Sequence, residues 1–159
     1  MRTPTVPVII GSTRRGRQTP KVARFIVERM ATVGGLTADV IDLADYRLPM
    51  LEERLKYLAD PPEPVVRFGG KIAAADAFVV VSPEYNGGYP GVLKNAIDYL
   101  NEQYENTLVG IVTVSAGEHG GGSCRELLKA TFGRLGATVA RESFTVNDVE
   151  RTFDDDGGT

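Results

Sequence analysis

The chain of 159 residues has the length of one domain, and we expect a single domain over residues 1–159. Hydrophobic residues make up 42% and charged residues 25% of it, which argues against disorder and for an ordinary globular core. The formal net charge of −3 argues against nucleic acid or an anionic membrane as a partner, so a phosphate site would have to be local. Cys124 is the only cysteine, which excludes an internal disulfide. No apolar run near Met1 is long enough for a signal sequence or a membrane span, so we expect a cytoplasmic protein.

The first predicted elements are a strand and a helix. Residues 6–10 form a short, apolar, β-branched run that ends at Gly11, which predicts a buried strand. Thr19 followed by Pro20 predicts an N-cap and the first residue of a helix. Apolar residues then recur at helical spacing until Gly34, where we expect the helix to end.

A weaker strand and an irregular segment follow. Residues 36–43 predict a second strand, whereas residues 47–64, with four prolines and mixed charges, have no clear period and predict an irregular excursion. Residues 65–75 have helical spacing despite Gly69 and Gly70, which each weaken a helix by about 1 kcal/mol relative to alanine.

The second half repeats the pattern of strand, loop and helix. Residues 78–82 are the clearest strand in the sequence, and they lead into a loop rich in glycine and proline over residues 83–91. An amphipathic helix is predicted over residues 92–100. Residues 108–114 then predict another strand, which leads into a glycine-rich loop over residues 115–122.

The last predicted elements are a helix and a strand. The helix carries Leu127, Leu128 and Phe132 and ends at Gly136. Residues 137–144 predict a final strand of moderate quality. No pattern for a long closing helix follows it, so we expect that helix to be absent from this chain.

Alternating strands and helices with short connections predict an α/β fold. Right-handed crossovers give a doubly wound, five-stranded parallel sheet with helices on both faces, and we expect the strand order 2-1-3-4-5. Ligands of such sheets bind outside the carboxyl ends of the strands, at the point between strands one and three where the winding reverses. The loops after strands one, three and four would meet at that edge.

The first of these loops has the composition of an anion site. Residues 11–19 combine Ser12 with three arginines and a run of backbone N–H groups ahead of a helix. Such N–H groups and the positive end of the helix attract phosphate, and arginines add forked hydrogen bonds. The loop lacks Gly-Lys-Ser/Thr and Gly-x-Gly-x-x-Gly, which argues against the common ATP and dinucleotide loops. The alternative is a solvated basic turn.

The second loop suits a flat aromatic ligand. Residues 83–91 place Tyr85, Tyr89 and an amide side chain among rigid prolines and glycines at the end of a strand. Either tyrosine could instead cover the sheet edge or a subunit contact. Glu84 could act as an acid, but a carboxylate in a loop is more often an acceptor for N–H groups or an interface group.

The third loop is flexible enough for close approach of its backbone to a ligand. The glycines in residues 115–122 permit N–H groups to reach a ring, although simple flexibility would give the same composition. His119 has no nucleophile or metal-ligand cluster near it in sequence, and we predict no metal site. Cys124 could be activated at a helix start, but a buried, inert thiol is the simpler interpretation.

Taken together, the loops resemble the NAD(P)H-dependent FMN reductase family, which includes quinone, azo-dye and chromate reductases, and the resemblance covers nearly the whole chain. Gly11-Ser-Thr-Arg-Arg-Gly-Arg17 is similar to the phosphate loop of the family. Pro83-Glu-Tyr-Asn86 with Pro90-Gly-Val-Leu-Lys-Asn-Ala-Ile-Asp98 is similar to its second flavin loop and the helix that follows, and this is the most specific motif. Ser115-x-Gly117 with Gly120-Gly121 is similar to the third loop.

The resemblance implies a flavodoxin-like FMN-binding domain that transfers hydride from NADPH or NADH to FMN and on to a small acceptor: FMN, a quinone, an azo compound or a metal oxyanion. FMN carries the chemistry, and no catalytic side chain is implied. The family also implies a homodimer or homotetramer. The residues that the resemblance assigns to FMN are Ser12, Arg14, Arg17, Thr19, Pro83, Glu84, Tyr85, Asn86, Ser115 and Gly117.

Two alternatives remain open from the sequence. A flavodoxin-like electron carrier would bind FMN without oxidising NAD(P)H, but such carriers usually have an acidic surface and a phosphate loop rich in threonine and serine. A regulatory or interaction domain without a flavin could share the fold, since a fold alone does not fix a function.

Overall fold

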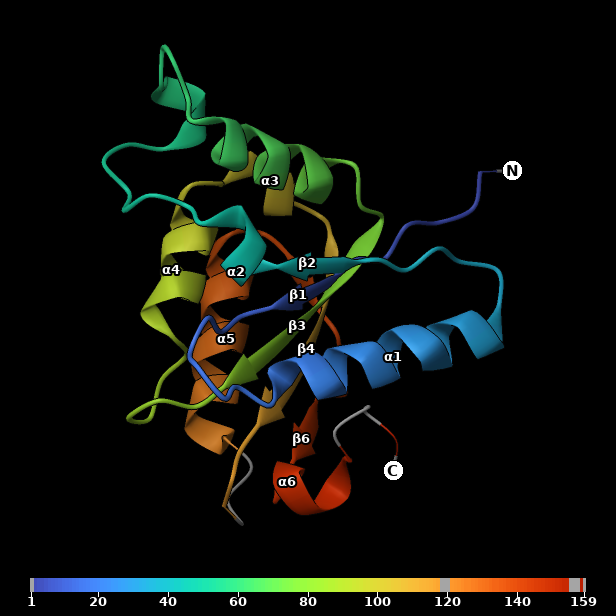
Figure 1. The fold of residues 1–159 in the computed structure, drawn as a ribbon. Coiled ribbons are helices and arrows are strands. Elements are labelled where there is room, and N and C mark those ends of the chain that lie inside the picture. The colour runs from blue at the N-terminus through green and yellow to red at the C-terminus, as the bar shows by residue number, and fades with distance from the viewer. Residues whose placement is uncertain (1, 118–120, 155–157, 159) are drawn as a thin grey trace.

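A computed structural model describes residues 2–117, 121–154 and 158. A parallel sheet runs through the middle of the molecule, with helices on both of its faces (Figure 1). The strands are β1 (Val8–Ile10), β2 (Val40–Asp42), β3 (Ala77–Pro83), β4 (Leu108–Val114), β5 (Thr138–Val139) and β6 (Phe144–Val146). Their order is β2-β1-β3-β4-β5, and β6 also pairs with β4, so the predicted order 2-1-3-4-5 is confirmed.

The helices follow the strands as a doubly wound sheet requires. They are α1 (Thr19–Val33), α2 (Leu43–Tyr46), α3 (Glu63–Ala73), α4 (Gly91–Asp98), α5 (Gly122–Arg134) and α6 (Val149–Thr152), with 3-10 turns at Leu55–Tyr57 and Glu102–Tyr104. After β6 the described chain forms only the single turn α6.

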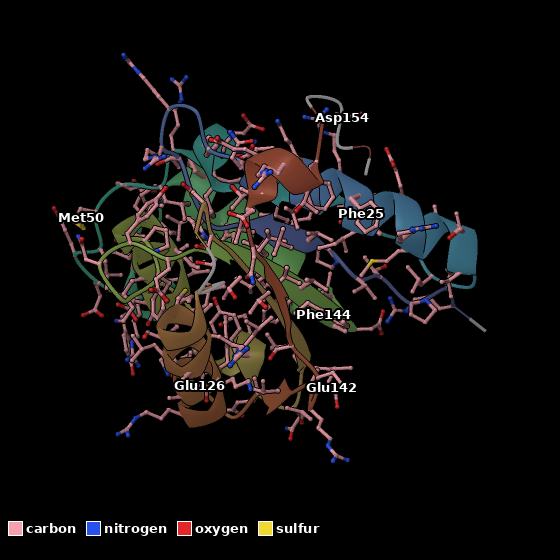
Figure 2. All side chains as sticks on the ribbon, turned by 90° about the horizontal axis from the view of Figure 1, so that it is seen from below. Phe25, Met50, Glu126, Glu142, Phe144 and Asp154 are labelled. Carbon is pink, nitrogen blue, oxygen red and sulfur yellow. The ribbon has the colours of Figure 1, made fainter. Side chains whose placement is uncertain are left out.

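Alternation along the strands divides the core into two layers. Ile9 and Val80 face a large cluster with residues of α3, α4 and α5, whereas Val8 and Val81 face a smaller cluster with α1 and α6. Phe25 of α1 contributes to the smaller cluster, on the side of the sheet where α6 lies (Figure 2). The sheet is therefore buried on both faces, as its apolar strands predict.

The last predicted strand, residues 137–144, is interrupted. β5 pairs with the first residues of β4 and β6 with its last residues, so the two short strands share the fifth position of the sheet. Between them, the side chains of Arg141 and Glu142 are 96% and 82% exposed, and this charged stretch does not join the ladder.

Two other boundaries differ from the sequence prediction. The strand expected over residues 36–43 is reduced to β2, and Thr37 forms only an isolated bridge with Thr5. Thr19 is the first residue of α1 and not its N-cap, a position that Gln18 occupies without a capping hydrogen bond from its side chain. Thr19 is only 1% exposed, and its hydroxyl makes no capping hydrogen bond within the described residues.

Candidate functional site

The three predicted loops meet at the carboxyl ends of the central strands. The turns after β1, β3 and β4 enclose a cavity of about 150 Å³, and α6 closes one side of it. The residues that line it are Arg14, Arg17, Gln18, Thr19, Pro83, Glu84, Tyr85, Val114, Ser115, Ala116, Val149 and Glu150. The prediction that these loops gather at one edge of the sheet is confirmed.

The turn between β1 and α1 begins at a close contact between Gly11 and β3. Gly11 donates its N–H to the carbonyl oxygen of Val81 at 2.9 Å. A Cβ atom on Gly11 would lie 2.8 Å from Leu93 Cδ2 and 3.2 Å from that same carbonyl oxygen, so only glycine fits without displacing its neighbours. This bond holds the start of the basic turn beside β3, near the carboxyl end of that strand.

The same turn presents polar groups that lack protein partners. Within the described residues, the backbone N–H groups of Thr13 and Arg15 have no hydrogen-bond acceptor, but both residues are exposed and neither lines the cavity. The hydroxyl of Thr19 and the side-chain oxygen of Gln18 are buried and likewise have no partner in the described part of the chain. Buried polar groups are almost always hydrogen-bonded, so unpaired ones on the wall of a cavity indicate a ligand that would pair them.

The arginines of the turn differ in what they contact. The guanidinium of Arg14 lies over the ring of Tyr85, 5.5 Å from its centroid, and borders the cavity. Arg17 forms a two-pronged ion pair with Asp42, in which Nη1 and Nη2 each lie 2.6 Å from a carboxylate oxygen. Its Nη1 also donates to the carbonyl oxygen of Ser12. Arg15 is exposed and does not line the cavity.

A tight hairpin shapes the second turn. Tyr85 and Gly88 exchange two backbone hydrogen bonds of 2.8 and 3.1 Å, and Asn86 and Gly87 between them have φ angles of 52° and 80°. Two consecutive positive φ angles define a type I′ turn, for which Asn-Gly is the favoured pair. The turn directs Tyr85 toward the basic turn, where its hydroxyl lies 2.7 Å from Ser12 Oγ.

Glu84 accepts a hydrogen bond at the start of α5. Its Oε2 receives the N–H of Cys124 at 2.9 Å, which places a carboxylate where the helix dipole favours negative charge. The thiol of Cys124 is fully buried, and this burial raises its pKa to about 11. The interpretation of Glu84 as an N–H acceptor and of Cys124 as a buried thiol is therefore confirmed.

The third turn is fixed to the last elements of the chain. Ser115 donates its N–H to Val146 and accepts the N–H of Val149 on its carbonyl oxygen, at 2.9 and 3.3 Å. Ser115 Oγ accepts the N–H of Gly117 at 3.0 Å. This attachment places α6 against the cavity, where Val149 is buried and Glu150 is exposed at the rim.

Seven of the ten predicted site residues line the cavity, and three do not. Ser12 is fully buried beneath Tyr85, while Asn86 and Gly117 are exposed beyond the cavity wall. Sequence reasoning missed Gln18, Val114, Ala116, Val149 and Glu150. The last two have no signal in the sequence, because only the pairing of β6 with β4 brings them to the site. His119 lies outside the described residues.

The helix of the second motif has a structural role as well. Asn95 accepts the N–H of Leu51 at 2.8 Å and donates to the carbonyl oxygen of Pro49 at 2.7 Å. The Tyr99 hydroxyl donates to the same carbonyl oxygen at 3.2 Å. These bonds hold the irregular excursion against α4, away from the cavity.

A sequence model of the NADPH-dependent FMN reductase family matches residues 4–150. The chain belongs to this family. It is 38% identical over 142 residues to an NAD(P)H-dependent FMN reductase of Schizosaccharomyces pombe, covering 87% of this chain and 70% of that relative. It is also 31% identical to a quinone reductase of Pseudomonas putida, covering 94% and 88% of the two chains.

A solved structure agrees with this assignment. The flavoenzyme NAD(P)H:(acceptor) oxidoreductase FerB of Paracoccus denitrificans is 26% identical, with a TM-score of 0.79 over 98% of this chain and 86% of that one. The predicted flavodoxin-like, doubly wound fold and the resemblance drawn from the three loops are both confirmed.

Within the described residues, no helix is long and apolar enough to cross a membrane. In the same part of the chain, no three His, Cys, Asp or Glu side chains gather as ligands for a metal ion.

Proposed function

We propose that this protein binds FMN in the cavity between the three turns and uses it to transfer hydride from NADPH or NADH to a small acceptor. The observation that carries the proposal is the buried Thr19 hydroxyl, which has no partner among the described residues and faces a cavity bordered by Arg14. A phosphate can accept hydrogen bonds from both of these groups. The donor set therefore fits the phosphate end of FMN.

The remaining lining groups suit the other parts of FMN. The unpaired side-chain oxygen of Gln18 suits a ribityl hydroxyl, which can donate a hydrogen bond to it. The cavity of about 150 Å³ is smaller than pockets that enclose whole ligands, so the ring system would rest at the rim between residues 83–86 and 115–117. When bound, FMN supplies the hydride and electron-transfer chemistry. The protein residues hold and orient it.

The acceptor would be a small molecule such as free FMN, a quinone, an azo compound or a metal oxyanion. The names of relatives support this range, since they include a quinone reductase and an FMN-dependent NADPH-azoreductase of Staphylococcus aureus. We also propose a homodimer or homotetramer in the cytoplasm, as the family resemblance implies. Light scattering of the purified protein measures its oligomeric state, and cell fractionation tests its cytoplasmic location.

One preparation tests the function. The purified protein should show the visible spectrum of bound flavin, or acquire it with added FMN, and should then consume NADPH when FMN or a quinone is supplied. A yellow protein that does not oxidise NADPH or NADH would identify an electron carrier. A colourless protein that does not bind FMN would contradict the cofactor assignment.

A further inference from the structure

Asp42 stands at the carboxyl end of β2, one strand away from the cavity. It is not among the residues that line the cavity, and its side chain is 16% exposed. Its two carboxylate oxygens bind the two terminal nitrogens of Arg17 at 2.6 Å, and the Arg17 side chain is 18% exposed. This pairing is the geometry in which an arginine and a carboxylate interact most strongly and specifically.

Arg17 links Asp42 to the basic turn. Its Nη1 is shared between the Asp42 carboxylate and the carbonyl oxygen of Ser12. Because the peptide bond is planar and trans, the N–H of Thr13 must point away from the side on which Arg17 holds the Ser12 carbonyl. That N–H has no acceptor in the described residues.

We propose that Asp42 is a positioning residue for the phosphate of FMN: through Arg17 and the Ser12 carbonyl, it fixes the conformation of the basic turn, whose Arg14 and Thr19 line the cavity. In this proposal Arg17 stabilises the conformation of the turn and does not bind the phosphate itself. This inference rests on the proposed function and assigns within it a role to a residue that does not touch the cofactor.

The substitution Asp42→Asn tests this chain of contacts with little other disturbance. Asp42 Oδ1 also caps α2 by accepting the N–H of Ala44 at 2.9 Å, and asparagine is an equally good N-cap. The amide, however, removes the charge and presents an NH₂ donor where Arg17 needs an acceptor. The variant therefore weakens the ion pair and keeps the cap.

The measurement is the binding of FMN and of riboflavin, which lacks the phosphate, followed by quenching of flavin fluorescence. We expect Asp42→Asn to weaken FMN binding on the order of tenfold and to leave riboflavin affinity within about twofold, because the Asp42–Arg17 pair acts on the part of the turn proposed to bind the phosphate and makes no hydrogen bond to the side chain of Gln18, which suits the ribityl chain. Inorganic phosphate should compete with FMN less well in the variant than in the wild type. The single variant Arg17→Met and the double variant Arg17→Met/Asp42→Asn should have equal FMN affinities. Once Arg17 is gone, Asp42 has no ion pair left for the second substitution to remove.

Asp39→Asn is the matched control. Asp39 lies three residues earlier, pairs with the exposed Lys71 and does not line the cavity, so its loss should leave FMN affinity unchanged. Thermal unfolding of each ligand-free variant reports general damage to the fold.

Several outcomes would overturn the inference. Tighter FMN binding by Asp42→Asn would mean that Asp42 competes with phosphate for Arg17. Equal loss of FMN and riboflavin affinity, or a loss matched by Asp39→Asn, would mean a merely structural role. A wild-type protein that binds neither flavin would overturn the proposed function together with this inference, whereas unchanged FMN selectivity in Asp42→Asn would overturn the inference alone.

Discussion

The hydroxyl of Tyr85 lies 2.7 Å from Ser12 Oγ and joins the aromatic turn after β3 to the basic turn after β1. Ser12 is fully buried, so its hydroxyl cannot reach a ligand while Tyr85 covers it. The bond therefore fixes the position of the aromatic turn relative to the basic turn. Both residues belong to the motifs that carried the family resemblance.

This bond can be measured by a double-mutant cycle. We expect Tyr85→Phe and Ser12→Ala each to lower the free energy of unfolding by about 0.5–1.5 kcal/mol, the usual contribution of a neutral hydrogen bond. The double variant should lose less than the sum, because the second change removes a bond that is already broken. Urea unfolding of the ligand-free protein supplies the values, and strictly additive losses would contradict the coupling.

Arg14 lines the cavity, where its guanidinium lies over the Tyr85 ring, whereas Arg17 pairs with Asp42. We expect Arg14→Ala to weaken FMN by about 1–3 kcal/mol through loss of charge-assisted hydrogen bonds, with a smaller dependence of affinity on salt. Arg15→Ala is the control, because the neighbouring arginine does not line the cavity. Fluorescence titration with FMN compares the two variants, and equal losses would show that only the total charge of the turn matters.

Glu150 places a negative charge at the rim of the same cavity. We expect Glu150→Gln to tighten FMN about two- to fivefold at low salt, since an exposed charge close to the phosphate repels it only moderately. Glu142→Gln is the control, because Glu142 is 82% exposed and lies far from α6 in Figure 2. Titrations at two salt concentrations check the effect, which should shrink at the higher one. No change in FMN affinity at low salt would show that the charge of Glu150 does not act on the phosphate.

The fold was predictable because its signals are local. Apolar runs such as residues 78–82 and the glycine turns after them define the strands and the edge where the site forms, and that much is confirmed. The side-chain partners were not predictable. Nothing in the sequence shows that Arg17 pairs with Asp42, 25 positions away, or that α6 returns to the cavity, because both contacts depend on how β2 and β6 are placed in the sheet.

Cys124 should be inert to alkylation in the folded protein. Burial raises its thiol pKa to about 11, so at pH 8.5 the thiolate fraction is on the order of a hundredfold lower than in the unfolded chain, whose thiol pKa is about 8.5. Iodoacetamide labelling with and without denaturant measures the ratio. Rapid labelling of the folded protein would contradict the burial.

The same shift makes stability depend on pH. The unfolded thiol loses its proton first, so the contribution of Cys124 to stability is complete below about pH 8.5 and is lost as pH rises toward 11. Cys124→Ala should lack this part of the alkaline loss. Urea unfolding of both proteins between pH 8 and 10.5 tests it, and parallel curves would count against it.

Substitution of Thr19 should have opposite effects on the stability of the ligand-free protein and on FMN binding. Its hydroxyl is buried without a partner in the described part of the chain, and an unpaired buried group of this kind costs about 1–3 kcal/mol. We expect Thr19→Val, which keeps the shape and removes the hydroxyl, to raise the free energy of unfolding of the ligand-free protein by about 1 kcal/mol. The same variant should weaken FMN by about 1 kcal/mol, because phosphate supplies the missing partner. Thr13→Val is the control, since Thr13 is exposed. Thr19→Val should leave riboflavin affinity unchanged. If the variant instead loses both stability and FMN affinity, the hydroxyl is paired within the ligand-free protein and is not a free ligand-binding group.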